Sequence, residues 1–130
     1  MTVGILLLTH EAMGAALVST AHHILGRMPL AVDTCAVPPG SDLDAAVRDV
    51  AARLRALDSG EGVLVLTDVY GATPSNIAER LGGIGIKLRR VSGLNLPMLM
   101  RVLNYPEQSL AELTETAASG GRTGVIIDHA

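Results

Sequence analysis

Residues 3–10 have the sequence VGILLLTH, a short apolar run that ends in a threonine and a histidine. Residues 63–68, VLVLTD, repeat this pattern with a threonine and an aspartate at the end. Strands that are apolar on both of their sides are typical of a parallel sheet that is covered by helices on both faces. These two stretches therefore predict buried strands of an α/β protein.

The remaining segments alternate between helix and strand patterns. Further strands are expected at 30–37, 86–91 and 123–128. Helices are expected at 12–25, between a cap at Ser41 and a turn at 60–62, at 75–81, from Leu96 onward, and at 107–119. This order predicts a single doubly wound α/β domain over residues 1–130, with a mainly parallel open sheet, helices on both faces and right-handed crossovers.

Two adjacent glycines, Gly120 and Gly121, precede the last predicted strand. Because glycine interrupts helices, we expect the last helix to break there. A hinge at this point would let residues 123–128 pair with a partner subunit.

Composition and charge exclude several classes of partner. Of the 130 residues, 48% are hydrophobic, the net charge is -3, and two tyrosines are the only aromatic residues apart from histidine. Neither nucleic acid nor an anionic membrane surface is an expected partner of such a chain. The single cysteine, Cys35, rules out an internal disulfide, and no Cys/His spacing predicts a metal site. With no basic leader and no apolar run near 20 residues, we expect a cytoplasmic protein without a cofactor.

Polar residues follow three of the predicted strands at the point where each strand ends. They are Thr9-His10, Thr67-Asp68 and the loop 92–95, SGLN. In an open α/β sheet, sites form outside the carboxyl ends of the strands. We therefore expect these side chains to share one edge of the sheet.

His10 is the candidate reactive residue. A turn between a strand and a helix is exposed, and a neutral imidazole has one lone pair that can attack phosphorus. The other ring nitrogen needs an acceptor that fixes the tautomer, and Asp68 supplies it if the two strands are neighbours. The alternative interpretation is a surface histidine beside an unrelated aspartate.

Two loops could support a phosphoryl group at this edge. In 71–76, GATPSN, Gly71 permits a tight turn and Thr73 offers a hydroxyl and a backbone N–H at a helix start. Asn95 precedes the next helix, and its amide is in reach of the same edge. Thr9 is a further supporting candidate beside His10. The alternative is that Thr73 and Asn95 are ordinary helix caps.

Three segments together carry a resemblance to a known family. Residues 8–10 (LTH), 67–76 (TDVYGATPSN) and 93–99 (GLNLPML) resemble the IIA domain of the mannose-type phosphotransferase system. The resemblance implies that His10 accepts a phosphoryl group from the phosphocarrier HPr and passes it to a IIB domain, and so acts as a phosphotransferase. It also implies that Asp68 orients His10, that Thr73 is the hydroxyl residue before the loop proline, and that the protein is a homodimer with an exchanged C-terminal strand.

The sequence departs from the family pattern in two ways. Ala72 stands where the family loop usually carries a second glycine, and no IIB domain follows within these 130 residues. A IIB acceptor is therefore expected to be a separate chain, with the membrane components IIC and IID reached only indirectly. The second departure also leaves room for a regulatory role in place of transport.

Other functions remain open from the sequence. A regulatory phosphoprotein of the same fold is one, either in a non-transport branch of the system or as a phosphotransfer subunit of dihydroxyacetone-kinase type. A receiver-like domain phosphorylated on Asp68 is another, although only one carboxylate, Glu11, follows the first strand. A non-catalytic binding module is the third. The sugar and the reactive ring nitrogen of His10 are not set by the sequence.

Overall fold

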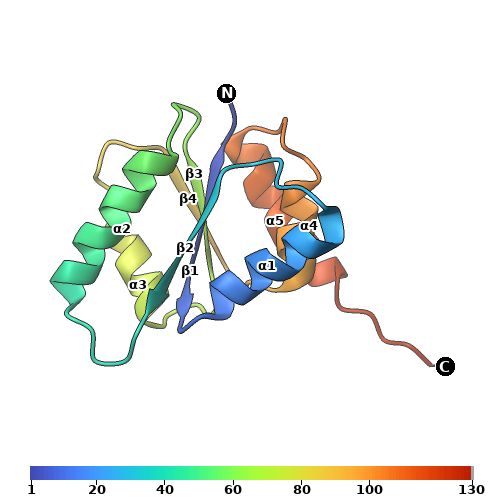
Figure 1. The fold of residues 1–130 in the computed structure, drawn as a ribbon, viewed down its shortest axis with the longest axis horizontal. Coiled ribbons are helices and arrows are strands. Elements are labelled where there is room, and N and C mark those ends of the chain that lie inside the picture. Colours follow the sequence, from blue (N-terminus) through green and yellow to red (C-terminus); the bar gives the residue numbers. More distant parts are fainter. Residues whose placement is uncertain (130) are drawn as a thin grey trace.

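The computed structural model describes residues 1–129 and shows a four-stranded sheet between two layers of helices (Figure 1). The strands are β1 (Gly4–His10), β2 (Val32–Val37), β3 (Val63–Thr67) and β4 (Leu88–Ser92). The helices are α1 (Met13–Leu25), α2 (Leu43–Leu57), α3 (Thr73–Glu79), α4 (Leu96–Leu103) and α5 (Leu110–Thr123).

All strand pairs are parallel, and the strand order in the sheet is β2-β1-β3-β4. The two most apolar strands, β1 and β3, are therefore neighbours at the centre of the sheet. Their register places Leu8 opposite Thr67, so both strands end at the same level. The predicted doubly wound parallel sheet is confirmed, and its register brings the residues after β1 and β3 to one edge.

Side chains of the central strands alternate between two cores. Ile5 and Leu7 pack on the face that is covered by α1, α4 and α5, together with residues such as Leu99 and Leu113. Leu6 and Leu8 pack on the face that is covered by α2 and α3, together with residues such as Leu54. Because both faces of the sheet are buried, the central strands need no polar positions until they reach the edge.

Local chemistry sets the helix ends, with small shifts from the sequence prediction. Gly26, in the left-handed conformation at φ +73°, ends α1 as expected. Asp42, and not Ser41, caps α2, because its carboxylate accepts the N–H of Asp44. Ser109 caps α5 in a capping box with Glu112, so this helix starts three residues later than predicted.

The C-terminal segment differs from the prediction. Gly120 and Gly121 do not break α5 but lie within it, buried against α4. The reason is close helix packing, since a Cβ at Gly120 would come within 2.6 Å of Cβ of Arg101. Residues 125–129 form no strand within the described chain and project away from the body (Figure 1). The predicted helix break at Gly120-Gly121 is therefore wrong, whereas pairing of residues 123–128 with a second subunit stays a prediction.

Within residues 1–129, no helix has the length and apolar character that a membrane crossing requires. The longest, α2, has 15 residues and carries charges along its length. A bilayer core needs about 20 apolar residues in a helix.

Candidate functional site

His10 and Asp68 form a hydrogen-bonded pair at the carboxyl edge of β1 and β3. His10 is the last residue of β1, and Asp68 directly follows β3. The Nδ1 atom of His10 lies 2.8 Å from Oδ2 of Asp68, and the backbone N–H of His10 donates to the same oxygen at 3.0 Å. The other oxygen, Oδ1, accepts the backbone N–H of Val69 at 3.0 Å. Both oxygens of Asp68 are therefore engaged.

The environment of Asp68 favours the ionised carboxylate. Burial alone would raise the pKa of Asp68, but the backbone and ring hydrogen bonds and the charge of His10, with the Val69 N–H, outweigh it. The pKa of Asp68 is thus held below its usual value. An ionised carboxylate only accepts hydrogen bonds, so Nδ1 of His10 carries the proton that it donates.

The pairing leaves Nε2 as the ring nitrogen of His10 that is free to react. A neutral imidazole that is protonated on Nδ1 has its lone pair on Nε2. The side chain of His10 is 47% exposed, whereas that of Asp68 is 5% exposed. The geometry therefore presents a half-exposed imidazole whose Nδ1 is hydrogen-bonded to a buried carboxylate.

A cavity of about 310 Å³ opens beside His10. Thr73 lies in its wall, together with residues of the β2–α2 loop and of α2 and α3. Gly71 makes the preceding turn at φ +80°, a conformation that glycine adopts without strain. Ala72, and not Thr73, occupies the cap position, and exposed Thr73 is the first residue of α3.

Thr9 and Asn95 are placed differently. Thr9 is buried beneath the β1–α1 turn, where its hydroxyl accepts the N–H of Gly14 at 3.0 Å. Asn95 caps α4 by accepting the N–H of Met98, and its side-chain NH₂ donates to the carbonyl of Gly121. Asn95 lines a hollow that does not include His10. The structure thus brings His10, Asp68 and Thr73 together and leaves Asn95 apart.

The sequence reasoning missed the loop that follows β2. Pro38, Pro39 and Gly40 line the cavity next to His10, and Leu43 and Ile77 complete its apolar wall. The sequence indicated a turn there and nothing more. The rule that places sites at the carboxyl ends of strands would have pointed to this loop, because β2 is the other neighbour of β1.

The fold and these residues define a doubly wound α/β protein whose polar site lies at the carboxyl edge of its two central strands. Over residues 4–118 the sequence matches the family model EIIA-man, described as the PTS system fructose IIA component. The chain belongs to this family of IIA components of the phosphotransferase system (PTS).

Relatives agree with this assignment. The chain is 32% identical over 127 residues, or 96% of its length, to the PTS system mannose-specific EIIAB component of Escherichia coli, and it spans 39% of the length of that relative. It resembles the structure of the mannose/sorbose-specific IIA subunit from Enterococcus faecalis with a TM-score of 0.88 and 27% identity, over 100% of this chain and 97% of that one. The EIIA component from Streptococcus agalactiae matches with a TM-score of 0.79 and 25% identity, over 98% and 97%.

Proposed function

We propose that the protein is a phosphohistidine relay in which His10 accepts a phosphoryl group from HPr and passes it to a IIB component. The observation that carries the proposal is the 2.8 Å contact between Nδ1 of His10 and the buried carboxylate of Asp68. It fixes the tautomer of a half-exposed imidazole, which is what a histidine nucleophile needs.

The transfer step balances with the residues of the site. The Nε2 lone pair of His10 attacks the phosphorus of the donor phosphohistidine, a new N–P bond forms, and the donor N–P bond breaks with its electron pair returning to the donor ring. The ring of His10 then gains positive charge, which the Asp68 carboxylate stabilises through the Nδ1–H. In the second transfer, a nucleophile of IIB attacks the phosphorus, and the N–P bond to His10 breaks with its electron pair returning to Nε2. Phosphoryl transfer depends chiefly on position and charge stabilisation.

Thr73 and Gly71 support a phosphoryl group on Nε2 in this proposal. Thr73 lines the cavity beside His10 and is exposed there, so its hydroxyl is available to phosphoryl oxygens. Gly71 allows the tight turn that places Thr73 beside the cavity. Asn95 is a weaker candidate, since its amide already bonds Met98 and Gly121.

Asp68 is not favoured as the phosphoryl acceptor. Its side chain is 5% exposed, and both of its oxygens accept hydrogen bonds from His10 or Val69. An attacking carboxylate would have to give up these bonds and reach a donor through buried surroundings. The receiver-like alternative is therefore disfavoured relative to phosphorylation of His10.

The assembly proposed for the relay is a cytoplasmic homodimer that works with a IIB component and, through it, with the membrane components IIC and IID. Support for the dimer comes from the tail, where Val125, Ile126 and Ile127 are each more than 70% exposed. Consecutive large apolar side chains in water favour a partner surface. In the proposed dimer, this segment pairs with the other subunit.

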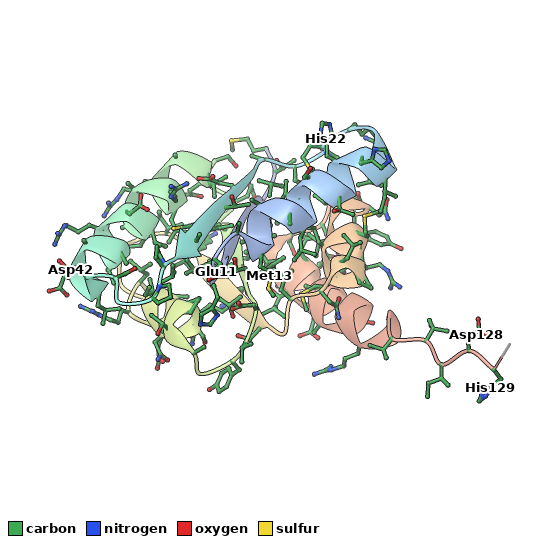
Figure 2. The ribbon with its side chains drawn as sticks, turned by 60° about the horizontal axis from the view of Figure 1, so that its bottom comes forward. Glu11, Met13, His22, Asp42, Asp128 and His129 are labelled. Atoms are coloured by element: carbon green, nitrogen blue, oxygen red, sulfur yellow. The ribbon has the colours of Figure 1, made fainter. Side chains whose placement is uncertain are left out.

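The test is incubation of the protein with enzyme I, HPr and phosphoenolpyruvate, followed by mass spectrometry of the intact chain and of its His10 peptide. We expect one phosphoryl group on wild-type protein and none on His10→Ala. His22→Ala is the matched control, because His22 is exposed and lies near the far end of α1 from Glu11 (Figure 2). Phosphoryl uptake by His10→Ala would refute the assignment.

A further inference from the structure

The turn that follows His10 is short and strained. Only Glu11 and Ala12 separate β1 from α1, and Figure 2 shows Glu11 and Met13 at this turn. Glu11 has φ +46° and is the only residue other than glycine with positive φ within residues 1–129. A side chain with a Cβ is disfavoured in this region, so neighbouring contacts must hold it there.

One hydroxyl makes those contacts from both sides of the strained residue. Thr9 is 1% exposed, and its Oγ1 accepts the N–H of Gly14 at 3.0 Å and donates to the carbonyl of Glu11 at a longer 3.4 Å. The cap residue of α1, Ala12, has no side-chain hydrogen bond. Thr9 therefore satisfies a first-turn N–H that a capping side chain would otherwise bind.

Glycine at position 14 helps the helix start to come close enough for this bond. A Cβ on Gly14 would lie 3.2 Å from Cβ of Leu7 and 3.3 Å from Oγ1 of Thr9. The first turn of α1 thus sits directly on β1, with the Thr9 hydroxyl in the contact. The Thr9 hydroxyl therefore links β1 to the turn at Glu11 and to the first turn of α1.

His10 lies between two anchors. Its own N–H is held by Asp68, and the backbone that follows it is held by Thr9 through Glu11 and Gly14. The backbone before and after the His10 side chain is thus held by a hydrogen bond, and a rotation at residue 11 would disturb the peptide that joins His10 to α1.

From this arrangement we infer that Thr9 is a positioning residue, whose hydroxyl keeps Glu11 in the left-handed conformation and thereby aims Nε2 of His10 at the docked phosphoryl donor. The kinetic consequence rests on the proposed relay function. The structural consequence, a single orientation of the His10 ring, does not.

The first test compares Thr9→Val with Thr9→Ser. Valine keeps the shape and removes both hydrogen bonds, whereas serine keeps the hydroxyl. We expect the kcat of phosphoryl uptake from HPr to fall about tenfold or more in Thr9→Val with little change in KM, and to recover in Thr9→Ser. Thr114→Val, which removes a hydroxyl bond within α5, is the control for a purely structural loss. A serine variant as slow as the valine variant would overturn the inference.

The second test does not touch the core. Glu11→Val and Glu11→Asn remove the same exposed carboxylate, but asparagine tolerates the left-handed conformation and valine does not. We expect uptake to be retained in Glu11→Asn and lost by a similar factor in Glu11→Val. This pair also serves if Thr9→Val does not fold. Equal rates for the two Glu11 variants would contradict the inference.

Imidazole ¹⁵N NMR of His10 separates this inference from the relay proposal. We expect one sharp set of ring signals in wild type, Thr9→Ser and Glu11→Asn, and broadened or doubled signals in Thr9→Val and Glu11→Val. If wild-type protein takes up no phosphoryl group but these spectra differ as expected, the relay fails and the positioning role stands. If Thr9→Val gives the wild-type spectrum, the positioning role fails.

Discussion

Nδ1 of His10 and Oδ2 of Asp68 lie 2.8 Å apart although 58 positions separate the two residues in the sequence. The contact follows from the parallel pairing of β1 with β3, in which Leu8 is opposite Thr67. A shift of this register by one residue would move a side chain to the other face of the sheet. The two apolar strands that build the core therefore also determine whether the site exists.

The first prediction concerns the charge of Asp68. Asp68→Asn keeps the size of the side chain but removes the negative charge that stabilises the ring in the proposed transfer. We expect phosphoryl uptake from HPr to slow by at least about 100-fold, measured by quenched-flow with labelled phosphoenolpyruvate. Asp44→Asn, which removes an exposed carboxylate on α2, should leave the rate unchanged. Wild-type kinetics in Asp68→Asn would show that the pair is not used in the chemistry.

The second prediction concerns acid stability. The pKa of Asp68 in the folded protein is lowered below 3.8, the usual value for an aspartate in an unfolded chain. Such a group contributes stability that is fully present above the unfolded pKa and is lost as the pH falls through the folded pKa. We expect the difference in unfolding free energy between wild type and Asp68→Asn to shrink as the pH falls below about 3.8. Urea titrations at several pH values measure it, and a difference that is independent of pH would contradict the geometry.

The third prediction concerns the bond that holds the phosphoryl group. Because Nδ1 faces Asp68, we expect phosphorylation on Nε2 of His10. The adduct should be stable in alkali and labile in acid, as phosphoramidates are, and heteronuclear NMR should couple phosphorus to Nε2. An alkali-labile adduct would indicate an acyl phosphate on Asp68, and an Nδ1 adduct would mean that the Asp68 contact breaks before transfer.

Much of the fold follows from patterns that the sequence displays openly. The uninterrupted apolar runs that become β1 and β3 predict central parallel strands, because only a sheet that is covered on both faces buries every side chain. The predicted final strand at 123–128 is not formed in the single chain, and its pairing with a second subunit stays a prediction. Residues 123–128 have a strand composition, but a strand forms only where a neighbour offers its backbone, and none does within the described chain.

The two glycines of α5 show the limit of local propensity. Gly120 and Gly121 predict a helix break on intrinsic preference, yet both lie inside the helix. Their small size is needed where α5 crosses α4, and no local signal tells which helix will lie opposite. Glycine is roughly 1 kcal/mol less favourable than alanine in a helix, and here tertiary packing outweighs that cost.

At the site, the sequence predicts where the strands end but not the order of the strands in the sheet. The repeated pattern of threonine and a titratable residue marks His10 and Asp68, while their contact depends on β1 and β3 being neighbours, which the pattern alone leaves open. Asn95 carried the same kind of signal, but its oxygen binds the N–H of Met98 as a helix cap. A polar residue at a strand end can serve a ligand or a backbone, and only geometry separates the two.

The fourth prediction tests the packing of α5 on α4. Gly120→Ala gains helix propensity but places a Cβ 2.6 Å from Cβ of Arg101, an atom that is fixed to the α4 backbone. We expect a net loss of about 1–2 kcal/mol in unfolding free energy, measured by urea denaturation. Gly83→Ala is the matched control, because a Cβ at Gly83 meets no atom within 4 Å, and it should be neutral or slightly stabilising. A stabilised Gly120→Ala would mean that α5 is free to move away from α4.

The fifth prediction concerns the C-terminal tail and the proposed dimer. Val125, Ile126 and Ile127 are 72%, 77% and 81% exposed, and the tail that carries them extends to Asp128 and His129 away from the body (Figure 2). Full burial of one such side chain contributes roughly 1.5–3 kcal/mol, so a second subunit that covers all three gains enough to associate.

We expect sedimentation equilibrium at micromolar concentration to give a dimer for wild type and a monomer for the triple variant Val125→Ser, Ile126→Ser, Ile127→Ser. The helical signal in circular dichroism should be retained in that variant, because these residues belong to no helix in the single chain. Met13→Ser removes a 49% exposed apolar side chain at the start of α1, and this control variant should remain dimeric. A wild-type protein that stays monomeric, or a triple variant that associates as tightly as wild type, would rule out the tail as the dimer contact.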